Sequence, residues 1–214
     1  MGKDKLVRQK QVSIKHSSKE LGMSEEQIVT KTAESMYFER ITICQKAFER
    51  GDVKMGIEDF ARQVKEASIK LAALSGDQKN RALAQIARSL SDREAEIIKA
   101  NREDLERSQR ENLPEPLLKR LKFDQPKIAD VIDGINSLIQ LEDPVGKTLL
   151  STGLDEDLEL YKVTCPIGVI GVIFESRPDA LVQISTLCLK SGNCVMLKGG
   201  SEAMETNRIL ADII

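Results

Sequence analysis

The stretch GVIGVIFESRPDALVQISTLCLKSGNCVMLKGGSEA, residues Gly168 to Ala203, decides the fold. Its first run, Gly168 to Phe174, is apolar and β-branched, which predicts a strand that is buried on both faces. Helical spacing follows from Ala180 to Cys188, and Cys194 to Leu197 then predicts a second apolar strand. A strand, a helix and a strand in this order predict a right-handed parallel crossover, with any ligand at the carboxyl ends of the strands.

The turn Lys198-Gly199-Gly200-Ser201 follows the second strand and precedes a helix predicted from Glu202 to Ile214. Two glycines allow the backbone to approach a ligand closely, Ser201 can cap the helix or donate to a phosphate, and a helix N-terminus favours negative charge. Lys198 adds a cation. The same pattern is also a common strand-to-helix connector, and neither G-x-G-x-x-G nor Gly-Lys-Ser/Thr is present. Both interpretations therefore stay open on the residues alone.

The first strand ends in Glu175-Ser176-Arg177-Pro178. Pro178 is suited to the first turn of a helix, and the planar guanidinium of Arg177 suits a carboxylate or a phosphate. A charged cluster directly after a buried strand predicts either a buried ion pair or a ligand site.

Upstream of this unit the chain is predicted to be mainly helical. Capping-box patterns begin at Ser24 and Ser91, and Asp124 before Pro126 is typical of another helix start. Alternating polarity from Leu158 to Thr164 predicts a strand with one wet face. Apolar residues at helical spacing predict one long helix or two over residues 24–50, and further helices over residues 61–74, 83–90, 91–105 and 128–139. Asp143-Pro144-Val145-Gly146 ends the helical part.

Composition favours a globular protein with a small-molecule partner. Hydrophobic residues make up 41% of the 214 residues, and the formal net charge is -2, so no overall field attracts nucleic acid. Neither an apolar run of about 18 residues nor a signal-peptide pattern is present. We therefore expect a cytoplasmic protein with no membrane partner.

The cysteines and the single histidine predict neither a metal site nor a disulfide framework. Cys44, Cys165, Cys188 and Cys194 are widely spaced, and His16 lies in a basic N-terminal segment. Cys188 and Cys194 have apolar neighbours, where cysteine usually acts as a small core residue. The basic segment itself predicts a solvated arm or an interaction arm.

The sequence from Pro166 to Ala203, PIGVIGVIFESRPDALVQISTLCLKSGNCVMLKGGSEA, closely resembles the gamma-glutamyl phosphate reductases. These are the glutamate-5-semialdehyde dehydrogenases of proline biosynthesis, in the aldehyde dehydrogenase superfamily. The likeness extends upstream through LSGDQKNRALAQIARSL, AEIIKANREDLERS and LEDPVGKTLLSTGLDEDLELYKVTCPIGV, and covers roughly Phe60 to Ile214. The fold class that the resemblance implies is α/β, aldehyde dehydrogenase-like: N-terminal helices followed by the start of an incomplete Rossmann-like parallel sheet.

The resemblance implies NADPH-dependent reduction of L-glutamyl 5-phosphate to L-glutamate 5-semialdehyde with release of phosphate. A cysteine thiolate forms a thioester in this superfamily, and hydride from the nicotinamide reduces it. Arg177 is implied to reach the anionic substrate. The cofactor is implied to lie along Ile173, Phe174, Glu175 and Ser176 near the nicotinamide, and along Lys198, Gly199, Gly200, Ser201 and Glu202 at the adenosine 2'-phosphate end.

The resemblance also implies how the chain is organised. Residues 1–55 are expected to be an N-terminal extension made of a flexible arm and a helix, and residues 56–214 the front of the NADP-binding domain. The strand near residues 158–164 matches a segment that helps to build a homo-oligomer. The catalytic cysteine is expected beyond Ile214, so no catalytic residue is assigned and the chain alone is expected to be inactive. The alternative is a non-catalytic nucleotide-binding or assembly module whose N-terminal extension binds a partner protein.

Overall fold

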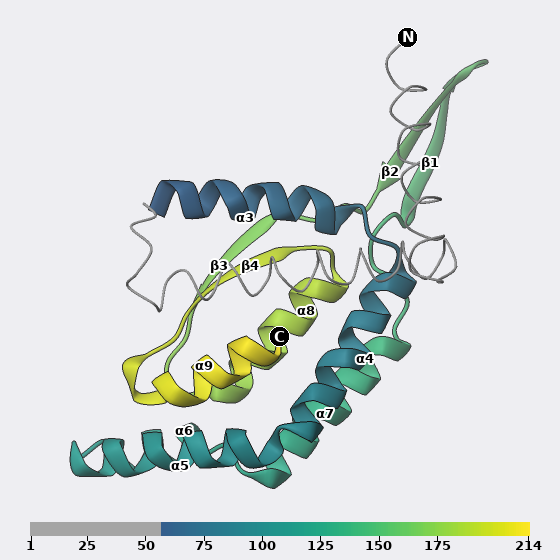
Figure 1. Ribbon diagram of the computed structural model, residues 1–214. Coiled ribbons are helices and arrows are strands. Elements are labelled where there is room, and N and C mark those ends of the chain that lie inside the picture. Colours follow the sequence, from purple (N-terminus) through teal and green to yellow (C-terminus); the bar gives the residue numbers. More distant parts are fainter. Residues whose placement is uncertain (1–56) are drawn as a thin grey trace, which may run out of the picture. The chain divides into compact units, whose positions relative to one another are not determined.

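The computed structural model describes residues 57–214, which lie in the second of two compact units, Thr42–Ile214. The predicted arm, the predicted helix over residues 24–50, His16 and Cys44 lie outside the described residues. In the described part, helices surround a small parallel sheet, and a β-hairpin extends from them (Figure 1).

Seven α-helices form in the described residues. Three come first: α3 (Ile57–Ala72), α4 (Gly76–Asp92) and α5 (Glu94–Arg110). The short α6 (Glu115–Leu121) and then α7 (Gln125–Gln140) complete the helical part before the strands. The last two are α8 (Pro178–Lys190) and α9 (Met204–Ile213), with one turn of 3-10 helix, η1 (Ser201–Ala203), before α9.

Local sequence explains the start of α4 but not that of α5. Ser75 caps α4: its hydroxyl accepts from the Gln78 N–H, and the Gln78 side chain accepts from the Ser75 N–H. The capping box predicted at Ser91 is wrong, because α4 continues through Asp92 and α5 starts after Arg93 without a side-chain cap. Instead, the Arg93 N–H donates to the carbonyls of Ser89 and Ser91, so that α4 ends directly before α5 begins.

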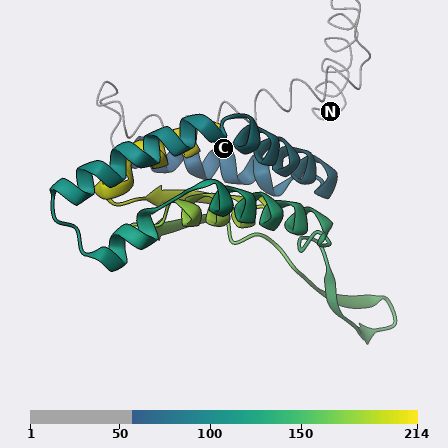
Figure 2. The same cartoon turned by 90° about the horizontal axis from the view of Figure 1, so that it is seen from below.

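The predicted parallel crossover is confirmed. Strands β3 (Val169–Ile173) and β4 (Cys194–Lys198) pair in parallel, with Val169 opposite Cys194 and Ile173 opposite Lys198, and α8 connects them. Helix α3 packs on both strands and α8 packs on β4, so the two-stranded sheet lies between these helices (Figure 2).

The prediction that the first strand is buried on both faces is wrong. Gly171 and Ile173 of β3 are exposed, and the Ile173 side chain is 75% accessible. The core lies instead between the helices, where residues such as Leu83, Ile97, Ile128, Leu181 and Leu210 are fully buried. The described residues thus form an α/β fold, but they do not contain a larger Rossmann sheet.

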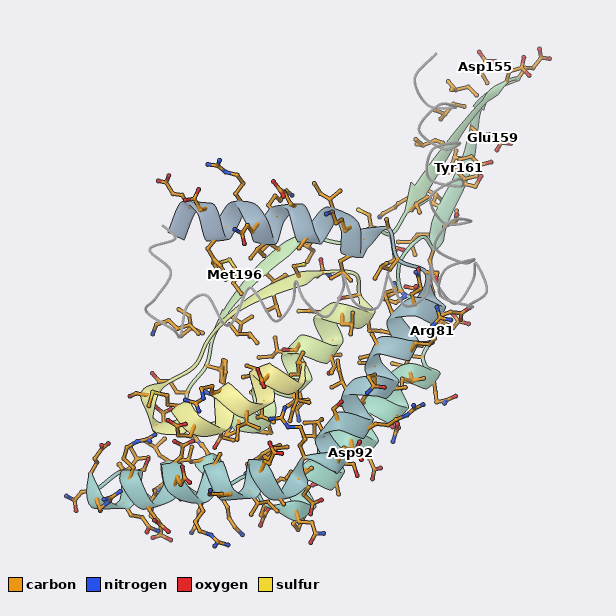
Figure 3. All side chains as sticks on the ribbon, viewed as in Figure 1. Arg81, Asp92, Asp155, Glu159, Tyr161 and Met196 are labelled. Atoms are coloured by element: carbon orange, nitrogen blue, oxygen red, sulfur yellow. The ribbon has the colours of Figure 1, made fainter. Side chains whose placement is uncertain are left out.

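A separate hairpin precedes the crossover. Strand β1 (Thr148–Asp155), which the sequence did not predict, pairs in antiparallel register with β2 (Leu158–Val163), which it did predict. Every residue of both strands is exposed, and Asp155, Glu159 and Tyr161 mark the hairpin in Figure 3. No helix in the described residues is long and apolar enough to cross a membrane.

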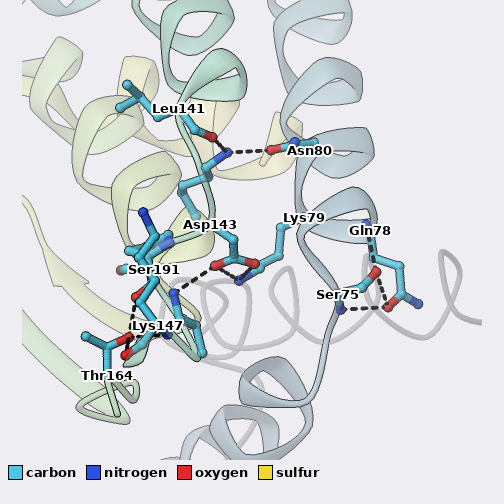
Figure 4. A network of polar contacts seen from close by, with 12 residues as sticks. Ser75, Gln78, Lys79, Asn80, Leu141, Asp143, Lys147, Thr164 and Ser191 are labelled. Atoms are coloured by element: carbon cyan, nitrogen blue, oxygen red, sulfur yellow. Dashed lines mark hydrogen bonds and ion pairs between the residues drawn. The ribbon is translucent and has the colours of Figure 1, made fainter. Parts of the chain in front are cut away.

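A buried ionic network joins α4, α7 and α8 (Figure 4). The Lys79 ammonium, 1% exposed, lies 2.6 Å from one oxygen of Asp143 and 2.7 Å from the other. The Lys190 ammonium donates to the Leu141 carbonyl at 2.6 Å and to Asn80 Oδ1 at 2.7 Å. The two lysines thereby fix the segment that leaves α7 against the start of α4 and the end of α8.

Burial pushes the pKa of Asp143 up, but the hydrogen bonds from Lys79 and Val145 and the charges of Lys79 and Lys190 outweigh it, so the pKa lies below its usual value. A carboxyl group with a depressed folded-state pKa stabilises the fold above its unfolded pKa, and that stability is lost as the pH falls through the folded pKa.

The first prediction compares the wild type with Asp143→Asn. The wild type should be more stable near neutral pH, and the difference in unfolding free energy should shrink as the pH falls from about 6 to about 3. Urea denaturation at several pH values measures this difference. If the difference in unfolding free energy did not depend on pH, the charge of Asp143 would contribute nothing to the network.

Candidate functional site

The parallel register brings the two predicted site segments to the same edge of the sheet. Ile173 and Lys198 are partners, and the Phe174 N–H donates to the Lys198 carbonyl at 3.0 Å. The turns that follow, residues 174–177 and 199–202, are therefore neighbours at the carboxyl ends of the strands, where open α/β sheets bind ligands.

A direct contact joins these two turns. Both the N–H and the hydroxyl of Ser176 donate to Glu202 Oε1, at 2.5 and 2.9 Å. Ser176 is 4% exposed and has a φ of 49°, in the left-handed region that non-glycine residues seldom adopt. The Glu202 carboxylate thus satisfies the buried donors of Ser176 and links the end of β3 to the end of β4.

Side chains lie close to both glycines of the turn. A Cβ at Gly199 would lie 2.4 Å from Asn207 Nδ2, and one at Gly200 would lie 2.2 Å from Glu202 Oε2. Asn207 is 7% exposed, and its Oδ1 has no hydrogen-bond partner among the described residues. The turn therefore has a closely approached backbone and a buried acceptor beside it that lacks a donor.

The remaining predicted cofactor residues surround this contact. Ile173, Glu175, Lys198 and Ser201 are exposed, and Phe174 is half-buried, with its ring 3.3 Å from the position of a Cβ on Gly199. Ser201 does not cap α9 as predicted, because it lies in η1 and α9 begins only at Met204. All nine predicted cofactor residues nevertheless belong to one edge of the sheet.

Arg177, predicted for the substrate, forms an exposed ion pair rather than a buried one. Its Nη2 lies 3.0 Å from Asp179 Oδ2 at the start of α8, and its side chain is 54% exposed. The hydrogen bond and charge of Asp179 raise the pKa of Arg177, so the group remains a cation.

Sequence reasoning missed three residues of α5 that hold the turn. Asp104 is fully buried and accepts from the backbone N–H groups of Glu205 and Thr206, at 3.2 and 2.7 Å. Asn101 donates to Thr206 Oγ1, and Arg107 donates to the carbonyls of Ser201 and Glu202. The signal was present, since Asn101 and Asp104 continue the buried helical spacing that begins at Ile97.

The α5 contacts also change the expected source of anion binding. The N–H groups of Glu205 and Thr206 in the first turn of α9 already bond to the Asp104 carboxylate. An anion at this helix start is therefore supplied by the chain itself, and the side chains and backbone of the preceding turn are left to meet a ligand.

The described cysteines do not lie in a catalytic arrangement. Cys188 is buried in α8, and burial raises the pKa of its thiol, which disfavours the reactive thiolate. Cys165 is exposed, and Cys194 opens β4 at the opposite end of the strand from Lys198. Among residues 57–214 no group of three His, Cys, Asp or Glu side chains is placed to hold a metal ion.

Comparison with known proteins gives a consistent result. The chain is 76% identical over 160 residues to the gamma-glutamyl phosphate reductases of Pelotomaculum thermopropionicum and Acetivibrio thermocellus, which covers 75% of this chain and 37% of each relative. The chain is thus similar to gamma-glutamyl phosphate reductases, and it spans a little over a third of the length of these relatives.

Solved structures of gamma-glutamyl phosphate reductases share the fold. The Thermotoga maritima enzyme matches with a TM-score of 0.69 at 38% identity, and the Saccharomyces cerevisiae enzyme with 0.70 at 40% identity. Each match covers 72% of this chain, and 37% and 39% of the respective structures. No protein-family model matches the chain. The resemblance stated from the sequence is confirmed.

The second prediction concerns the backbone of Ser176. Both Ser176→Ala and Ser176→Gly remove the hydroxyl, but only glycine adopts a φ of 49° without strain. The glycine variant should be the more stable by about 1 kcal/mol, as measured by urea denaturation.

Ser185, in the middle of α8 and 9% exposed, provides the control. Its alanine variant should be more stable than its glycine variant, because the helix favours alanine. If the alanine variant were also more stable than the glycine variant at Ser176, this result would contradict the left-handed conformation of that residue.

Proposed function

We propose that this chain supplies the cofactor-binding part of an NADPH-dependent gamma-glutamyl phosphate reductase, which reduces L-glutamyl 5-phosphate to L-glutamate 5-semialdehyde and releases phosphate. The 76% identity to two such reductases over 160 residues carries the proposal. The convergence of both predicted turns on one sheet edge supports it. The remainder of the Rossmann-like sheet and the catalytic cysteine belong to the proposed complete enzyme.

The residues present fit a dinucleotide. Gly199 and Gly200 carry no side chains of their own, and Lys198 is an exposed cation at the end of β4. The Asn207 side chain lies against Gly199, and its Oδ1 has no hydrogen-bond partner among the described residues. A ribose hydroxyl is the type of donor that such an acceptor lacks. Lys198, Gly199, Gly200, Ser201 and Glu202 would hold the adenosine end with its 2'-phosphate.

At the other strand end, Ile173, Phe174, Glu175 and Ser176 would line the groove toward the nicotinamide. When bound, NADPH supplies the hydride for the reduction. The contact between Ser176 and Glu202 links the two turns that would hold the two ends of the cofactor. Arg177 would bind an anionic group of the substrate, since its guanidinium is more than half exposed and can form paired hydrogen bonds.

The third prediction tests the cofactor turn with Lys198→Glu. Reversing this exposed charge should repel the 2'-phosphate and weaken NADPH binding by about tenfold or more, while thermal stability stays within about 0.5 kcal/mol of wild type. Titration calorimetry measures the affinity. Lys99→Glu, at an exposed position on α5, is the control and should bind NADPH as the wild type does. Equal affinity in all three proteins would contradict the proposed role of Lys198.

The hairpin supports a second function, which is self-assembly. The cross-strand register places Leu150, Leu158 and Leu160 on the same face, and their side chains are 53–55% exposed. The same face also carries Thr152 and Lys162, and the other face carries Ser151, Glu159, Tyr161 and Val163. A face rich in exposed leucine is typical of an interface, and we infer that it pairs with another copy of the chain in a homo-oligomer.

The fourth prediction compares Leu160→Asp with Tyr161→Asp, which lies on the opposite face of the same strand. The first substitution should lower the oligomeric state, because a buried, unpaired carboxylate opposes association. The second should leave it unchanged. Light scattering coupled to size-exclusion chromatography measures the mass. Identical masses for the wild type and Leu160→Asp would exclude this face as the interface.

A further inference from the structure

One face of α5 is polar where the helical spacing calls for apolar residues. Asn101 and Asp104 are 3% and 0% exposed, and Arg107, one turn further on, has a side chain that is 28% exposed. Asn101 Nδ2 donates to the Leu121 carbonyl at 2.9 Å, and its Oδ1 accepts from the Phe123 N–H at 2.7 Å. The face is thus anchored to the end of α6 on one side and to α9 on the other.

The Asp104 carboxylate is bonded by four donors. Arg107 Nη2 lies 2.5 Å from Oδ1, and the Glu205 N–H donates to the same oxygen at 3.2 Å. The Thr206 N–H and hydroxyl both donate to Oδ2 at 2.7 Å. A buried carboxylate is costly unless it is fully hydrogen-bonded, so Asp104 holds the first turn of α9 in one position.

Arg107 extends this arrangement to the cofactor turn. Its Nη2 donates to the Ser201 carbonyl at 3.0 Å and to the Glu202 carbonyl at 3.3 Å. In a trans peptide the N–H points away from the preceding carbonyl. With the carbonyls of Ser201 and Glu202 turned toward α5, the N–H groups of Glu202 and Ala203 therefore point away from it.

We propose that Asp104 and Arg107 are positioning residues for the cofactor turn, an assignment that rests on the cofactor role proposed above. Asp104 supplies the anion that the start of α9 requires, and Arg107 sets the direction of the peptides at residues 201–203. Neither side chain needs to touch the nucleotide. Their effect is to present the turn in the conformation that binds it, which lowers the ordering cost of binding.

The contacts of the Arg107 guanidinium are confined to Asp104 and the turn. Removing the guanidinium takes away the ion pair to the buried Asp104 carboxylate and the bonds to the Ser201 and Glu202 carbonyls, and it leaves Asp104 with three donors from α9. A local effect without a global one is therefore the signature of a positioning role.

The test compares Arg107→Gln with Arg110→Gln in the full chain. Arg110 is exposed on the same helix and donates only to the Glu106 carbonyl of that helix. Without ligand, amide hydrogen exchange at residues 199–206 should speed up about tenfold in Arg107→Gln and stay at the wild-type rate in Arg110→Gln. Exchange in α4 and α7 should not change in either variant.

Nucleotide titration completes the test. Arg107→Gln should bind NADPH about tenfold more weakly and should lose less affinity for NADH, because only NADPH carries the 2'-phosphate that the proposed site would hold at this turn. Arg107→Lys, which keeps a cationic donor for Asp104, should recover part of the affinity. A wild type that binds neither nucleotide would refute the proposed function, and the exchange data would still decide the positioning role. Unchanged exchange at residues 199–206, or equal loss of NADPH and NADH affinity together with a lowered melting temperature, would overturn it.

Discussion

The buried carboxylate of Asp104 constrains the turn at residues 199–202, which joins β4 to α9. It carries a formal charge at 0% exposure, and it receives two backbone N–H groups and a hydroxyl from the first turn of α9. These bonds require α9 to start at one place against α5. Because η1 and α9 follow β4 closely in the chain, these hydrogen bonds also fix the position of the carboxyl end of β4.

Side chains of this chain join the carboxyl ends of β3 and β4. Glu202 bonds to Ser176 across the two strand ends, and Gly200 leaves room for the Glu202 carboxylate. The acidic side chains at Asp104 and Glu202 are thus both engaged by internal donors, while Lys198 stays exposed. This division of charge leaves a cation and backbone groups for an anionic ligand, which agrees with the dinucleotide implied by the similarity to gamma-glutamyl phosphate reductases.

The crossover from β3 to β4 was predictable because β-branched runs and helical spacing act locally. The burial of β3 was not predictable, since it depends on which other elements cover the strand. In the structure Ile173 is exposed. The exposed β1 was missed because TLLSTGLD does not alternate regularly in polarity, and its pairing with β2 is interrupted by two register shifts. The two turns of the site were predictable because they carry glycines and charges. The roles of Asp104 and Arg107 were not, because these residues lie about 100 residues away from the turn in sequence and only the fold brings them to it.

Amide hydrogen exchange with and without saturating NADPH tests whether this sheet edge binds the cofactor, because it locates the cofactor on the chain without requiring turnover. We expect slower exchange at residues 174–177 and 199–207 when NADPH is bound, and no change in the hairpin at residues 148–163. Protection that is absent from both turns, or that appears only outside them, would contradict the assignment of this sheet edge as the cofactor site.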